Sequence, residues 1–258
     1  MRVYRLMLLA TSLVMLSALG LADECGSRLW KEYHGTRLYR LPDSSTYFFM
    51  TDHMAVDADG APNAYHPGDI GLDYLANAGY PSQSWWPDVL VVDPDDSRRA
   101  YVQQEGEYKG YFVSKTTLTD KSKKSTDPAR YVDASHVPYL VFPGSFYKMN
   151  GTGLLGDLGV AVNIQLERTT PFVVADIGPS EAKLGEVSIN LAERLSGNTV
   201  NPRTGSGTPQ GDNLYILFPY SGRQHRWPLS YDEMERLTNQ QLTRLGGLEK
   251  IIGCAQSL

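Results

Sequence analysis

Short apolar runs separated by turn residues dominate this chain of 258 residues. Such runs, many with alternating polar residues, are typical of β-strands bounded by turns. Between residues 37 and 50, two runs rich in Tyr, Phe and Leu flank a Pro-Asp-Ser-Ser turn, which predicts a hairpin. We expect further strands at 89–92, 108–113, 139–142, 159–166, 172–175 and 214–218.

Helical spacing is less frequent than strand patterning. We expect helices over 71–78, from Glu186 to Leu195, and over 230–248. At the start of the last helix, Ser230 and Glu233 have the spacing of a capping box. Because strands outnumber helices, the predicted fold class is mainly β: a β-barrel-like domain, a double-psi-type barrel among the options, with one or two peripheral helices.

The N-terminus predicts export. Arg2 and Arg5 precede an apolar stretch over 6–21 that ends in small residues, which is the pattern of a secretory signal peptide. We expect cleavage after residue 22, which leaves a single domain over 23–258 that is secreted or periplasmic. A membrane anchor is the alternative, although the stretch is short and wrongly flanked for a bilayer span.

The net charge of the mature chain limits the kinds of molecule that the protein is expected to bind. Removal of residues 1–22 takes away two arginines and no acid, which changes the formal net charge from −5 to −7. An acidic surface disfavours nucleic acid and anionic membranes and is compatible with a cationic substrate. We expect a monomer that contacts no membrane after cleavage of the signal peptide.

Two cysteines remain after export, Cys25 and Cys254, at opposite ends of the domain. In an oxidising compartment such a pair is expected to form a disulfide, and two unpaired thiols are the alternative. A lipid anchor on Cys25 is less consistent with the sequence, because Glu24 precedes it where a small residue is expected.

The segment 172–195 contains the strongest candidate chemistry. An apolar run that predicts a buried strand is followed directly by Asp176. A Gly/Pro/Ser loop comes next, and Glu186 lies at the start of the predicted helix. Two carboxylates that face each other across a cleft can serve as the acid and the base of glycosidic bond cleavage. Both positions also have structural explanations, because an Asp often ends a strand and the helix dipole favours a Glu in the first turn.

Three motifs in order resemble the family 75 glycoside hydrolases, the fungal-type chitosanases. The run Asp-Ile-Gly-Pro from Asp176, with Leu-Gly-Glu-Val-Ser around Glu186, is similar to the family signature. Residues 54–60, Met-Ala-Val-Asp-Ala-Asp-Gly, are similar to its Asp-rich turn, and residues 215–219 with Trp-Pro at 227–228 to its closing strand. The resemblance covers about residues 47–235. Ala175 departs from it, because the family usually has Gly there, and Ala58 stands where some members have Cys.

The resemblance implies endo-hydrolysis of β-1,4-linked glucosamine polymer, chitosan, with inversion. It places the catalytic carboxylates at Asp176 and Glu186 and favours Glu186 as acid and Asp176 as base. Local arguments favour the reverse roles, since burial would raise the pKa of Asp176 and a helix dipole would lower that of Glu186. The roles therefore stay open at the level of sequence.

Candidate substrate-binding residues lie upstream: Asp57, Asp59, His66, Trp85 and Trp86. Adjacent Trp residues on a strand face opposite ways, so at most one of the two would touch a sugar. Asp-Ala-Asp-Gly at 57–60 resembles the start of a calcium loop, but position twelve would be Gly68 where a Glu is required. We therefore predict a tight turn with Gly60 at positive φ.

No metal or cofactor is expected, because the histidines are scattered and no Gly-x-Ser-x-Gly or phosphate-binding loop occurs. Two alternatives to a chitosanase remain. One is a periplasmic hydrolase or toxin that acts on peptidoglycan glycan strands and retains the carboxylate pair. The other, from a different class, is an inactive carbohydrate-binding protein, against which the presence of both carboxylates argues.

Overall fold

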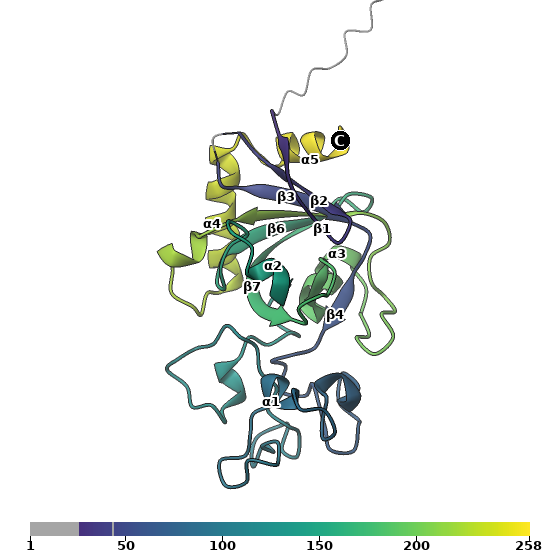
Figure 1. The fold of residues 1–258 in the computed structure, drawn as a ribbon, viewed down its shortest axis with the longest axis vertical. Coiled ribbons are helices and arrows are strands. Elements are labelled where there is room, and N and C mark those ends of the chain that lie inside the picture. Colours follow the sequence, from purple (N-terminus) through teal and green to yellow (C-terminus); the bar gives the residue numbers. More distant parts are fainter. Residues whose placement is uncertain (1–25, 43) are drawn as a thin grey trace, which may run out of the picture.

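The computed structural model describes residues 26–42 and 44–258, and within them one mixed sheet organises the fold (Figure 1). The sheet order is β1-β2-β3-β9-β6-β7-β5-β8-β4. The strands are β1 (Arg28–Tyr33), β2 (Thr36–Arg40), β3 (Tyr47–Thr51), β4 (Ala55–Asp57), β5 (Tyr139–Pro143), β6 (Leu158–Asn163), β7 (Arg168–Gly178), β8 (Glu186–Ser188) and β9 (Asn213–Phe218). The signal peptide over 1–22 and Cys25 lie outside the described residues.

Helices are short and peripheral to this sheet. They are η1 (Leu75–Ala78), α1 (Trp86–Val89), η2 (Pro128–Arg130), α2 (Gly144–Tyr147), α3 (Ile189–Ser196), η3 (Ser221–Gln224), α4 (Tyr231–Arg244) and α5 (Leu248–Gln256). In the part of the chain that the structure describes, no helix is both long and apolar enough to cross a bilayer. The prediction of a mainly β domain with peripheral helices is confirmed.

The sheet does not close into a barrel, so the barrel-like form of the prediction is wrong. Neighbouring strands pair antiparallel along the first part of the sheet, in the order β1-β2-β3-β9-β6-β7. In contrast, β5 pairs with β7, and β8 with β4, in parallel. The end strands β1 and β4 have no common partner that would close the ring. Strand pairing is shortest at the β4 end of the sheet. Strands β8 and β4 have three residues each, and β8 pairs with β5 only where Val187 lies opposite Leu140.

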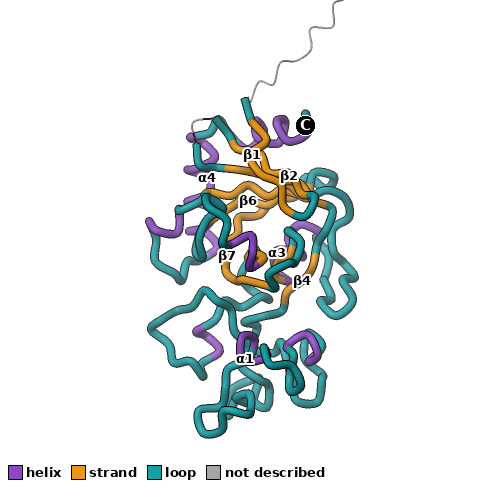
Figure 2. Tube along the Cα trace, viewed as in Figure 1, coloured by secondary structure: helices purple, strands orange, loops and turns teal. Residues whose placement is uncertain are grey.

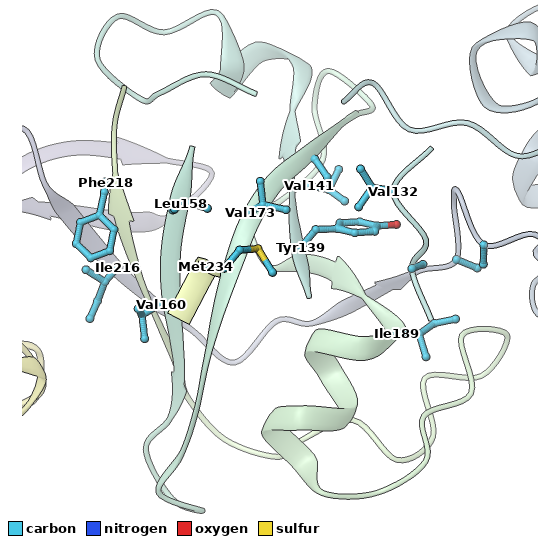
Figure 3. Packing of buried hydrophobic residues seen from close by; sticks show 14 of the residues in the cluster. Val132, Tyr139, Val141, Leu158, Val160, Val173, Ile189, Ile216, Phe218 and Met234 are labelled. Carbon is cyan, nitrogen blue, oxygen red and sulfur yellow. The ribbon is translucent and has the colours of Figure 1, made fainter. Parts of the chain in front are cut away.

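Both faces of the central strands are buried. In β7, Phe172 and Val174 face one layer with α2 and α3, and Val173 and Ala175 face the layer with α4. Figure 3 shows the second layer, where Met234 of α4 packs with side chains of β6, β7 and β9. Burial on both faces of β6, β9 and the middle of β7 is consistent with their mostly apolar sequences.

Most of the predicted strands are confirmed. The 37–50 hairpin forms as β2 and β3, and the runs at 139–142, 159–166, 172–175 and 214–218 form β5, β6, β7 and β9. The strands expected at 89–92 and 108–113 are wrong: these segments make only isolated bridges, such as Leu90 with Ser114. Instead of forming a ladder, Leu90 and Phe112 pack into the main core, and Val91 and Val113 form a small separate cluster with Tyr131.

The helix predictions need three corrections. Residues 71–78 form only the 3₁₀ helix η1, which ends at Gly79 with φ 70°. Glu186 does not open a helix: it begins β8, and α3 starts at Ile189 with Ser188 as its N-cap. The C-terminal helix has the expected Ser230–Glu233 capping box but ends at Arg244, and α5 follows as a separate helix after two glycines.

The disulfide stays a prediction. Cys254 lies buried in the last turns of α5. Its expected partner, Cys25, is outside the described residues.

Candidate functional site

A cleft of about 1160 Å³ lies between the β4, β7 and β8 end of the sheet and the long loop region, residues 58–138. Figure 2 shows this loop region as teal tube below the orange strands. Six carboxylates line the cleft: Asp57, Asp59, Asp73, Asp88, Asp176 and Glu186. We call it the acidic cleft, although Lys115 and Arg130 also line it.

Asp176 is placed by an irregularity in the sheet. The β5–β7 register pairs Leu140 with Val174 and then Val141 with Asp176, so Ala175 is an extra residue on β7. The carbonyl of Ala175 accepts a hydrogen bond from the backbone N–H of Leu118 in the loop region, at 2.8 Å. Such a shift re-aims the next side chain. It turns the buried Asp176 towards the acidic cleft.

Hydrogen bonds oppose the cost of burying Asp176. Its Oδ1 accepts from the Thr117 backbone N–H at 2.9 Å, the Thr117 hydroxyl at 2.5 Å and the Ile177 N–H at 2.8 Å. Burial has the largest effect and raises the pKa of Asp176 above its ordinary value, whereas these bonds and the charge of Lys115 limit the rise. The carboxyl is therefore pulled towards the ionised form by its immediate neighbours.

Glu186 has a different environment. It begins β8 beside Ala55 of β4, and a Cβ built on Gly178 would lie 3.0 Å from its Oε2. Among the described residues, no hydrogen-bond donor contacts its carboxylate. Burial, and then the charge of Asp176, raise its pKa to about 7. The prediction that a helix dipole lowers this pKa is wrong, because Glu186 lies in a strand and not in the first turn of α3.

Asp57 and Asp59 enter the cleft on a tight turn. Gly60 has φ 77°, as predicted, and a Cβ there would lie 2.1 Å from the Val132 carbonyl oxygen. Asp57 accepts from the Asp59 N–H at 2.8 Å and from the Tyr139 hydroxyl at 3.0 Å.

Both pKa values on this turn are raised well above the ordinary value. Burial is the main cause for each, followed by the charge of Asp59 for Asp57 and the charge of Asp176 for Asp59. The Ser114 hydroxyl donates to Asp59 Oδ1 at 3.0 Å and opposes the rise.

Asp57, Asp59 and Asp176 could present oxygens to a cation. One oxygen from each lies within 4.8 Å of the others, and this is the one such group found among the described residues. Carboxylate oxygens are calcium and magnesium ligands. However, protein donors already occupy both oxygens of Asp57. Carboxylates this close together can also share protons, and a cluster of acids does not by itself establish a cation site, so we assign it no metal.

The candidate substrate-binding residues Trp85, Trp86 and His66 have different environments in the structure. Trp85 is 43 % exposed and lines the acidic cleft, with its ring packed against Gly79. Trp86 is buried in the core, with its ring 5.2 Å from that of Tyr80. His66 does not line the cleft: its Nδ1 accepts from the Gly68 N–H, and its ring contacts Tyr111.

A short segment that no sequence pattern indicated donates hydrogen bonds to the carboxylates of the cleft. We call residues 114–117, Ser-Lys-Thr-Thr, the donor segment. Ser114 binds Asp59, Thr117 binds Asp176, and the Lys115 ammonium donates to the Pro87 carbonyl of α1. Shortly after this segment, Lys121 to Ser125 are exposed to solvent. No local signal marks the donor segment, because its partners lie 55 and 59 residues away.

The arrangement can perform acid–base chemistry. In the same cleft it holds one carboxyl with a pKa of about 7 and no donor among the described residues, and a second carboxyl whose Oδ1 accepts three hydrogen bonds that favour its ionised form. Pairs whose surroundings differ in this way commonly divide into an acid and a base. The chain matches no protein-family model and no curated protein. Its function therefore has to be inferred from the cleft and from the sequence motifs.

Proposed function

We propose that this chain is an exported, endo-acting glycoside hydrolase that cleaves β-1,4-linked glucosamine polymer with inversion. Glu186 is the general acid and Asp176 the general base. The observation that carries the proposal is the contrast between these two carboxyls within one cleft. Glu186 has no donor among the described residues and a pKa of about 7, whereas Asp176 accepts three hydrogen bonds.

The roles follow from the proton each group holds. Near pH 6, Glu186 is largely protonated and can donate to the glycosidic oxygen as the C1–O bond breaks. Asp176 accepts a proton from the water that attacks C1 from the opposite face, so that product has the inverted configuration. One water is consumed, and solvent restores both carboxyls. This mechanism requires that the carboxyl groups of Asp176 and Glu186 lie about 6.5–9.5 Å apart, so that the attacking water fits beside the base. That separation stays a prediction.

The lining of the cleft supports a cationic substrate. Asp57, Asp59, Asp73 and Asp88 also line the cleft, and bound ammonium groups of glucosamine would favour the ionised forms of these carboxyls, an interaction that the uncharged N-acetyl groups of chitin cannot make. Trp85 adds an exposed aromatic face on which a sugar ring can stack.

A substrate panel tests the proposal. The purified protein is incubated with chitosan, chitin and peptidoglycan sacculi, and new reducing ends are measured, with proton NMR of the first product to determine anomeric configuration. We expect release from chitosan above the other two, with α-configured ends. Preferential attack on sacculi would support a peptidoglycan hydrolase instead. Binding of chitosan without release from any polymer would support an inactive carbohydrate-binding protein.

A further inference from the structure

Three donors converge on one oxygen of Asp176. The Thr117 N–H, the Thr117 hydroxyl and the Ile177 N–H all donate to Oδ1, at 2.9, 2.5 and 2.8 Å. A carboxylate oxygen has two lone pairs, so Oδ1 is saturated. Within the described residues, no hydrogen bond reaches Oδ2. The two oxygens of Asp176 therefore differ in their capacity to accept a further proton.

We propose that Thr117 is a positioning residue that holds Asp176 so that Oδ2 is the oxygen that takes the proton from the attacking water. The proposal rests on the proposed function and assigns Thr117 a role that acts only through Asp176. The two donors of Thr117 have different roles in this proposal. The backbone N–H fixes the location of Oδ1, and the hydroxyl fixes the orientation of the carboxylate plane.

The backbone around Thr117 is held on both sides. The Thr116 hydroxyl donates to the Leu118 carbonyl at 2.8 Å and accepts from the Val132 N–H at 2.9 Å. The Leu118 N–H then binds the Ala175 carbonyl at 2.8 Å, directly beside Asp176. These bonds tie the donor segment to the irregular residue of β7. Thr117 is thus presented to Asp176 by fixed backbone, as a positioning group must be.

Other charged and titratable groups face Asp176 from every side of the cleft. They are Lys115 of the donor segment, Glu186 of β8, Asp57 of β4, Asp59 of the adjoining turn and Tyr139 of β5. The three carboxylates favour protonation of Asp176, and Lys115 opposes it. In such an acidic surrounding, loss of the Thr117 hydroxyl removes one of few groups that favour the base in its ionised form.

The test compares Thr117→Val, which removes the hydroxyl, with Thr117→Ser, which keeps it. Thr169→Val is the matched control, because Thr169 is an exposed residue of β7 that does not line the acidic cleft. For chitosan hydrolysis we expect Thr117→Val to lower kcat about tenfold, to leave KM within twofold, and to move the acid limb of the pH profile upward by about one pH unit. Thr117→Ser and Thr169→Val should resemble the wild type.

A second readout does not depend on turnover. Carbon-13 NMR titration of the Asp176 carboxyl, assigned with Asp176→Asn, should show a higher pKa in Thr117→Val than in Thr117→Ser. Should the valine variant fail to fold, Thr117→Ala removes the hydroxyl with less strain. An unchanged titration and acid limb would overturn the role of Thr117 while chitosan hydrolysis stands. A shifted titration in a protein that cleaves no polymer would overturn the base role together with the proposed function.

Discussion

The sheet and the loop region contribute different parts of the acidic cleft. Strands β4, β7 and β8 supply Asp57, Asp176 and Glu186, of which the last two are the proposed base and acid. The loop region, residues 58–138, supplies the donor segment, which binds Asp59 and Asp176, and Trp85, the proposed stacking face for a sugar. The sheet has continuous ladders, whereas the loop region has only isolated bridges among the described residues. Side chains of the loop region, such as Tyr65 and Phe112, share a core cluster with the sheet, and the loop region also has a small cluster of its own around Val91.

This division has a physical basis. Acid and base must keep a fixed separation, which backbone ladders and a packed core provide. Their pKa values, in contrast, depend on a few donors and charges, and single loop side chains can change those without disturbing the sheet. The comparison predicts that substitutions in the sheet affect turnover and folding strongly, and that substitutions in the loop region adjust pH dependence and substrate affinity.

The largest effect is expected at the sheet-borne carboxyls. Asp176→Asn and Glu186→Gln should each lower kcat by about 10²–10⁴-fold, because each removes one proton transfer. Circular dichroism should show intact folding. Asp232→Asn and Glu235→Gln on the exposed side of α4 are the matched controls and should retain wild-type rates. A folded Asp176→Asn or Glu186→Gln variant with near-normal turnover would contradict the assignment of that residue.

The next largest effect is expected on the free energy of unfolding, which should fall more for a buried substitution in the sheet than for one in the loop region. Phe172→Ala removes a fully buried ring from β7 and should lower the free energy of unfolding by about 3–5 kcal/mol. Val91→Ala in the loop cluster should lower it by about 1–2 kcal/mol. Urea denaturation of both variants measures the difference. Equal losses would show that the loop region is packed as firmly as the sheet and would remove the basis of the comparison.

Glu186 should also make stability depend on pH. Its pKa rises from 4.5 to about 7 on folding, so between these values the folded state binds more protons than the unfolded state. The stabilising contribution of the proton is present below about pH 4.5 and is lost as the pH rises through about 7.

Glu186→Gln removes this dependence. Relative to the wild type, the variant should gain stability between pH 4 and pH 8, by on the order of 3 kcal/mol. Urea unfolding at both pH values provides the measurement, with Glu235→Gln as control. A difference between variant and wild type that does not change with pH would show that the Glu186 carboxyl is not perturbed by folding.

The smallest effect is expected at the cleft rim. Trp85→Ala should raise KM for chitosan a few-fold, on the order of 1 kcal/mol, by removing a stacking face. Stability should change little, because the side chain is 43 % exposed. Trp86→Ala gives the contrast, since that buried ring should affect unfolding by about 3 kcal/mol or more. A large stability loss without a KM change in Trp85→Ala would make Trp85 a packing residue.

The sequence alone determined the elements whose signal is local. The apolar runs of β5, β6, β7 and β9 are confirmed, as are the turn at Gly60 and the Ser230 cap of α4. The fold class followed from the same runs. These features depend on neighbours within a few residues, through side-chain alternation, the φ freedom of glycine and capping hydrogen bonds, so they can be recognised without knowledge of the tertiary structure.

Tertiary structure decided the properties of the site. Glu186 follows a helix-like pattern, yet pairing with β4 places it in a strand and reverses the expected direction of its pKa shift. Trp85 and Trp86 are neighbours in sequence, but only packing shows which one is buried. The hydroxyl of Thr117 meets Asp176 across 59 residues. Burial and hydrogen bonding are set by groups distant in the chain, and local patterns carry no information about them.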